Sequence, residues 1–235
     1  MNVYSSLLVA LLMINNLCYA QNDTFYYNNQ NYWDSSRTYQ YQAIYKDSFG
    51  QTKSIEKITI KPTSTLWTYD VKQTLVNIFL DFSKHDSLKL ASNPLNGKNK
   101  KWVRIYQEGV IENSDKIWMH PIRQNQYILT EIAPFPELKF PVFLNSNWES
   151  TLYIYKAFGS FEGTVFSKYR ISNVVQKKYN FGEVKCWEIS SEGIHNKLGN
   201  NKVTYYFNEL YGFTEMNYIF FNKESIEIKL ENIKM

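Results

Sequence analysis

The sequence has few of the residues on which several common classes of protein depend. Its 235 residues include two cysteines, three histidines, six prolines and nine glycines. If a leader is removed before residue 21, Cys18 is lost and Cys186 is left alone, which excludes a scaffold stabilised by internal disulfides. Alanine occurs only six times, which argues against a helical bundle. No apolar run reaches the length of a bilayer-spanning helix, so the sequence predicts no membrane span.

Motifs for metal, nucleotide and nucleophilic chemistry are also missing. His85, His120 and His195 form no pair at zinc-ligand spacing, and no second cysteine of the mature chain joins them, so we expect no metal. There is no phosphate-binding glycine loop and no G-x-S-x-G elbow, which predicts no cofactor. We therefore assign no catalytic residue, and the balance of the sequence is against an enzyme.

The first 20 residues are typical of a secretory leader. They carry no charged side chain, and an apolar stretch from Leu7 to Ile14 precedes small residues at Cys18 and Ala20. The residues before Cys18 lack the small side chain of a lipidation site. We expect a signal peptide over residues 1–20, a mature chain from Gln21, and export to the periplasm or the extracellular space.

What the body of the chain does have is aromatic side chains and a period of two. Tyrosine occurs 19 times and phenylalanine 15 times, which favours strands. The clearest alternation places Ile226, Ile228 and Leu230 on one face and charged residues on the other. Residues 71–82 fit a strand better than a helix, and residues 163–235 have the spacing of a four- or five-strand meander. We predict a mainly β fold with little helix: a single curved antiparallel sheet forming a half-barrel or open barrel.

The predicted organisation has three parts. Residues 21–45, rich in Asn, Gln and Tyr, are expected to be a weakly ordered arm or an added edge strand. That arm has a single basic residue, Arg37, so its interleaved aromatics do not indicate nucleic-acid binding. Residues 46–235 are expected to form one antiparallel β domain. Three prolines between residues 134 and 141 predict an extended flap that lays Phe135, Leu138 and Phe140 across a sheet edge or face.

A candidate ligand-binding site follows from the loop around His120. Trp118, His120 and Arg123 lie within six residues, and the apolar flap supplies Phe135 and Phe140. A histidine, an arginine and the nearby Glu131 also suit an acid–base cluster. The simpler interpretation, which we favour, is that His120 and Pro121 cap a strand, that Trp118 belongs to the core, and that Arg123 pairs with a carboxylate at the surface.

Two motifs give the chain a resemblance to a known group. The loop Trp118-Met119-His120-Pro121-Ile122-Arg123 is followed by the hairpin Tyr206-Phe207-Asn208-Glu209-Leu210-Tyr211-Gly212-Phe213. In this pattern, over roughly residues 55–233, the chain resembles uncharacterised secreted β-rich proteins of Gram-negative bacteria, which are weakly similar to the lipoprotein-carrier (LolA/LolB-like) half-barrel group. The resemblance implies an envelope β domain and carries over no functional residue. A carrier needs an apolar cavity covered by helices, and this sequence predicts none.

Three functions remain open from the sequence. The first is a non-enzymatic periplasmic or secreted β domain that binds an apolar envelope ligand or a protein partner. The second is a carbohydrate-interacting module, for which the six tryptophans supply stacking rings. The third, less favoured, is a hydrolase that uses His120 and Glu131. The oligomeric state is not predicted.

Overall fold

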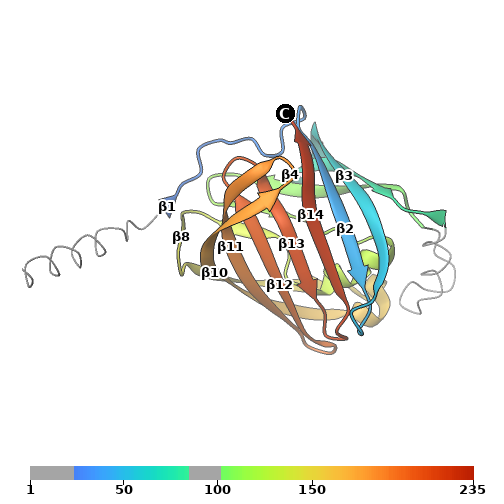
Figure 1. The fold of residues 1–235 in the computed structure, drawn as a ribbon. Helices are drawn as coiled ribbons and strands as arrows, with labels where there is room; N and C mark the ends of the chain where they lie inside the picture. The colour runs from blue at the N-terminus through green and yellow to red at the C-terminus, as the bar shows by residue number, and fades with distance from the viewer. Residues whose placement is uncertain (1–23, 85–101) are drawn as a thin grey trace, which may run out of the picture.

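The computed structural model describes residues 24–84 and 102–235, and the predicted leader lies outside this range. Nearly all of the described regular structure is β, in one large antiparallel sheet and a small two-stranded one (Figure 1). The strands of the first half of the large sheet are β2 (Thr38–Lys46), β3 (Thr52–Trp67), β4 (Asp70–Asp81), β5 (Ile105–Glu112), β6 (Lys116–Met119) and β7 (Glu137–Lys139). Those of the second half are β9 (Asn147–Ile154), β10 (Gly163–Tyr179), β11 (Gly182–His195), β12 (Gly199–Asn208), β13 (Gly212–Ile219) and β14 (Ser225–Lys234). The small sheet pairs β1 (Thr24–Phe25) with β8 (Val142–Phe143).

The 12-stranded sheet curls until it nearly closes into a barrel. Its order is β7-β6-β5-β4-β3-β2-β14-β13-β12-β11-β10-β9, so each half is a meander and the two halves join where β2 pairs with β14. The predicted curved antiparallel sheet with little helix is therefore confirmed. The predicted C-terminal meander is the five-strand run β10–β14, and the predicted strand over residues 71–82 is β4.

The core lies on the concave face, and the alternating sequence explains why. In β14, Ile226, Ile228 and Leu230 are buried while the residues between them are half-buried on the opposite face. Ile228 pairs with Ala43 of β2 and with Met216 of β13, both buried, so the junction of the two meanders is apolar. Such alternation is what one dry and one wet face of an antiparallel sheet require.

The N-terminal arm is the element in which the structure departs from expectation. Residues 38–46 form β2, which lies in the middle of the sheet between β3 and β14 and not at its edge. The reason is that Tyr39, Tyr41 and Tyr45 alternate with polar residues and fill the core with their rings. The Tyr41 hydroxyl donates to the Phe213 carbonyl at 2.9 Å, so burial leaves no polar atom unpaired there. The tyrosine rings of β2 therefore pack in the core, as aliphatic side chains would.

The concave face is covered by the chain's own residues 121–138, here called the inner segment. It contains a 3₁₀ helix, η2 (Asn125–Ile132), and ends in the edge strand β7. Tyr127, Ile132 and Leu138 of this segment are fully buried. Residues 133–138 of the expected apolar flap form its last part, which lies against the sheet's inner face as well as at its edge. Within the described residues, no helix is long and apolar enough to cross a membrane.

Candidate functional site

Three of the five predicted site residues meet in a row of rings, here called the aromatic cluster. Its members are Tyr69, Trp67, His120, Trp118 and Phe135. Ring centroids are 5.3 Å apart for Trp67 and Tyr69, 5.1 Å for Trp67 and His120, and 4.6 Å for Trp118 and His120. Phe135 closes the row at 5.8 Å from Trp118 and 5.7 Å from His120. The cluster thus runs from an exposed tyrosine to a buried phenylalanine.

Strand geometry explains how residues distant in the sequence reach one another. Trp67 ends β3 and Tyr69 lies in the tight turn before β4, so both project from the tip of one hairpin. Trp118 belongs to β6, where Ile117 and Met119 point into the core, so that its own ring takes the other face. The hairpin can lie this close because the neighbouring strand has a glycine. A Cβ on Gly109 would lie 2.5 Å from the Trp67 ring.

His120 has the environment of a structural residue. Its Nδ1 atom is buried and has no hydrogen-bond partner, and its backbone N–H donates to the Gly109 carbonyl at 3.3 Å. Burial, and to a smaller extent the charge of the nearby Arg123 guanidinium, together lower the pKa of His120 to about 3. The imidazole is therefore neutral at physiological pH. General acid–base catalysis needs a second group within hydrogen-bond reach, and no such bond from the His120 ring occurs among the described residues.

Arg123 lies below the cluster in a buried group of charges. Its guanidinium donates twice to Glu108, at 2.7 and 2.8 Å, and from its third nitrogen to both oxygens of Glu131, at 3.1 and 3.0 Å. Burial raises the pKa of both carboxyl groups, and the hydrogen bonds and charge of Arg123 oppose that rise. Glu131 is thus the partner of Arg123 and not of His120, so the pair on which a hydrolase would depend is not assembled.

Phe140 is the predicted site residue that stays apart. Its ring packs against Phe25 at 5.5 Å and Tyr27 at 5.4 Å, both from the N-terminal part of the described chain. The structure therefore brings Trp118, His120 and Phe135 together and places Arg123 beneath them. Phe140 packs elsewhere, against Phe25 and Tyr27.

Polar side chains and carbonyls hold the inner segment in place from several strands. Tyr127 donates to Glu56 of β3 at 2.8 Å, and Asn201 of β12 donates to the Ile132 carbonyl at 2.7 Å. Tyr169 of β10 donates to the Phe135 carbonyl at 3.0 Å, while the Tyr205 hydroxyl of β12 donates to the Pro134 carbonyl. Because these anchors lie on opposite parts of the curved sheet, the segment is fixed across the concave face.

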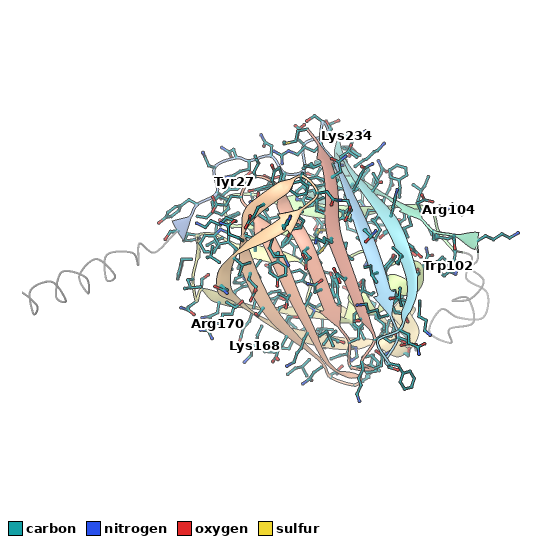
Figure 2. All side chains as sticks on the ribbon, in the orientation of Figure 1. Tyr27, Trp102, Arg104, Lys168, Arg170 and Lys234 are labelled. Atoms are coloured by element: carbon teal, nitrogen blue, oxygen red, sulfur yellow. The ribbon has the colours of Figure 1, made fainter. Side chains whose placement is uncertain are left out.

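A wide hollow lies on the outer face of β9–β12, with a volume of about 860 Å³. Lys168 and Arg170 of β10, both exposed and labelled in Figure 2, form part of its wall. Its charges are largely paired across strands: Lys168 lies 3.5 Å from Glu149 and Lys202 lies 3.0 Å from Glu192. The aromatic residues that line it, Trp148 and Tyr169, are buried and stacked on each other, so they offer no free ring face to a sugar.

Trp67, Tyr69 and Glu108 are site residues that the sequence did not reveal. Each is separated from His120 by at least eleven residues, and only the pairing of β5 with β4 and β6 brings them together. One signal was present: Trp67 and Tyr69 are separated by a single residue, with the apolar Leu66 and Val71 on either side of them. Four large side chains at a hairpin tip are more than a turn needs.

Comparison with known proteins gives no sequence match and several distant structural ones. No family model matches the chain. No curated protein matches it either. Among solved structures, it is similar to an exported protein of Bacteroides fragilis described as having a YmcC-like fold, with 8% identity, a TM-score of 0.47, and coverage of 91% of this chain and all of that one.

A lipoprotein of Parabacteroides distasonis is similar at 10% identity and a TM-score of 0.45, again over 91% of this chain and all of that one. An outer-membrane lipoprotein-sorting domain of Vibrio parahaemolyticus is similar at 11% identity and a TM-score of 0.35, over 84% and 83% of the two chains. These are the groups of proteins that the sequence motifs resemble. No functional residue is carried over from them to this chain.

Proposed function

We propose that this chain is a non-enzymatic binding domain of the bacterial cell envelope, and that it holds an apolar ligand at the exposed end of the aromatic cluster. The observation that carries the proposal is the hairpin tip. Tyr69 is 86% exposed, Val71 is 71% exposed and Leu66 is 61% exposed. These side chains adjoin Trp67, which leads to His120 and Trp118.

The concave face is the less suitable place for such a ligand, because the inner segment occupies it. The hairpin tip is different, since none of the described elements covers its side chains, which expose apolar area to water. Adjacent exposed apolar side chains mark binding sites more often than scattered ones do. A ligand that covers Tyr69 and Val71 gains about 25 cal/mol for each Å² of apolar surface removed from water.

The chemistry of the cluster supports an apolar ligand over a charged one. His120 is neutral, so the cluster offers aromatic faces and no fixed charge of its own. Two neighbouring cations are already paired: Arg123 is bound by Glu108 and Glu131, and Lys116, 5.9 Å from the Trp118 ring, lies 3.7 Å from Glu137. A flat or chain-like apolar group is therefore the ligand that the exposed rings accept best.

The test uses dansyl-labelled undecanoic acid as the probe, with energy transfer from tryptophan to dansyl as the readout. Trp67 and Trp118 would be the near donors. The double variant Tyr69→Ser with Val71→Ser should weaken binding of the probe by about tenfold or more, because it removes most of the exposed apolar area at the tip. Tyr26→Ser is the matched control, since Tyr26 is also a well-exposed tyrosine, on the N-terminal part of the chain.

Two results would contradict the proposal. One is binding that the double variant leaves unchanged. The other is probe binding that increases in Arg123→Met, a change expected to loosen the inner segment, while the hairpin variants have no effect. The second result would place the ligand on the concave face.

A further inference from the structure

A second exposed apolar surface lies at the opposite end of the barrel from the hairpin tip. Four connections meet there: residues 47–51 between β2 and β3, 155–162 between β9 and β10, 196–198 between β11 and β12, and 220–224 between β13 and β14. We call these connections the rim. Three of them lie at the lower end of the barrel in Figure 1.

Printed contacts join the four connections into one row. Lys46, beside the first, pairs with Ser225, beside the last. The backbone N–H of Phe221 donates to Asn201 at the start of β12, at 3.0 Å. Next along, the backbone N–H of Asn196 donates to the Thr164 carbonyl at 3.0 Å. The rim is therefore continuous along eight strands of one sheet.

Aromatic side chains are exposed on the rim, and at one of them the turn itself is fixed by hydrogen bonds. Phe49 is 87% exposed and Tyr155 is 76% exposed, and Phe158 is also exposed. The turn at Phe49 is fixed, since the Asp47 carboxylate accepts from the backbone N–H groups of Phe49 and Gln51, both at 3.0 Å. Exposure of this phenylalanine is thus built into a rigid turn and is not the result of a loose loop.

An apolar band continues from the rim onto the outer face of the barrel. Ile55 of β3, Ile194 of β11, Ile219 of β13 and Tyr153 of β9 are each more than half exposed. Cross-strand pairing keeps them close to the rim: Ile194 pairs with Asn200 at the start of β12, and Ile219 pairs with Ser225 at the start of β14. An ordinary solvated face would place polar side chains at these positions.

The charges of the rim favour an anionic partner. Lys156, Lys197 and Lys223 are exposed, one in each of three connections, and half-buried Lys46 flanks the fourth. The acidic residues are Asp47, Glu162 and Glu224. Asp47 is paired with Lys53 at 2.6 Å and bound to its own turn, so its charge is already matched. Four lysines then face two glutamates.

We propose that the rim is a docking surface for an anionic phospholipid bilayer. Its aromatic and aliphatic side chains are spread over four turns in a row, which suits a flat partner with an apolar interior more than a shaped protein ligand. Phenyl and phenol rings beside lysine side chains are what the boundary between headgroups and acyl chains accommodates. Each lysine adds attraction to an anionic surface. Bound in this way, the barrel would direct its hairpin tip away from the membrane.

The first experiment measures where the protein touches vesicles. An environment-sensitive nitrobenzoxadiazole label is placed at Ser48→Cys on the rim or at Thr68→Cys on the hairpin tip, in the full chain with Cys18→Ser. Cys186 is buried and does not compete for the label. With vesicles of phosphatidylglycerol and phosphatidylethanolamine, the rim label should shift to the blue and gain intensity, and doxyl-labelled lipids should quench it. The hairpin label should do neither. Equal responses, or a response at the hairpin tip alone, would overturn the proposal.

The second experiment tests the two parts of the surface by vesicle co-sedimentation. The triple variant Lys156→Glu, Lys197→Glu and Lys223→Glu should bind anionic vesicles at least 100-fold more weakly, at about fivefold for each lysine lost. Phe49→Ser with Tyr155→Ser should also weaken binding. Lys72→Glu, an exposed lysine near the hairpin tip, is the charge control and should change binding little. Unchanged binding in both rim variants, or equal binding to neutral phosphatidylcholine vesicles, would refute docking of an anionic bilayer at the rim.

Discussion

Arg123 offers the sharpest test of how the inner segment is held, and Arg123→Met is the change that isolates its charge. Methionine keeps the length and much of the apolar stem of arginine. It removes four hydrogen bonds of 2.7–3.1 Å, two to Glu108 and two to Glu131. Glu108 is 2% exposed and Glu131 is 4% exposed, so neither carboxylate can be hydrated in place.

The expected loss in the free energy of unfolding is about 3–5 kcal/mol, the range seen when one partner of a buried ion pair is removed. Urea unfolding at pH 7, followed by tryptophan fluorescence, measures it. Lys202→Met is the matched control. Lys202 lies 3.0 Å from Glu192, but both side chains are more than 60% exposed, so that pair should contribute at most about 1 kcal/mol.

The dependence on pH gives a second check on the reasoning. Burial already raises the pKa of Glu108 and Glu131, and without Arg123 nothing opposes that rise. A carboxyl group whose folded pKa is raised takes up its proton more readily in the folded state, so stability is regained as the pH falls through that pKa. The gap between Arg123→Met and the parent protein should therefore narrow at pH 5. A gap no larger than that of Lys202→Met, or one that widens on acidification, would refute this account of the charge cluster.

Three further predictions follow from the core and the aromatic cluster. Ile228→Ala should cost about 2–5 kcal/mol because the side chain is fully buried, while Glu227→Ala on the outer side of β14 should cost under about 0.5 kcal/mol; equal losses in urea unfolding would mean that the faces are reversed. His120→Phe should flatten the fall in stability between pH 6.5 and about 3, because the unfolded chain protonates this imidazole before the folded one does. The difference between the two proteins should approach about 1.4 kcal/mol per pH unit. Gly109→Ala should destabilise by about 1–3 kcal/mol and alter the tryptophan emission, since its Cβ would meet the Trp67 ring; a neutral substitution would contradict the close packing.

The alternation of apolar and polar residues was enough to predict the sheet, because it shows which side chains of a strand face the core and which face water. Ile226, Ile228 and Leu230 alternate with charges, and they are buried as that alternation requires. Residues 38–46 show where the same reasoning stopped short. Their tyrosines alternate with polar residues equally well. The many asparagines and glutamines of residues 21–45 nevertheless favoured a weakly ordered arm over a central strand. Tyrosine serves in a core when its hydroxyl reaches a carbonyl, and the sequence alone does not record that partner.

The candidate site was only partly predictable for a related reason. Trp118, His120 and Arg123 are neighbours in sequence and could be selected together. Trp67 and Glu108 reach them only through the pairing of β4 with β5 and of β5 with β6. Arg123 was expected to pair with a carboxylate at the surface; it does pair with carboxylates, but the surface location was wrong, because Glu108 and Glu131 are both buried. Which carboxylate would bind it depends on register, which is set by the whole sheet.

The inner segment decides between binding inside the barrel and binding on its surface. A curved sheet offers a ligand its concave face, but this chain places its own residues 121–138 there. Freeing that face would break the bonds of Arg123 with Glu108 and those of Tyr169 and Asn201 with the segment's carbonyls. Each buried donor or acceptor left unpaired would cost about 1–3 kcal/mol, and the charged group more. The binding free energy of an apolar ligand on the concave face would have to exceed the total cost of these unpaired groups. The hairpin tip and the rim require no such opening, because their apolar side chains are already exposed. For this chain, surface binding is therefore the less costly route, and the two proposed surfaces lie at opposite ends of the same sheet.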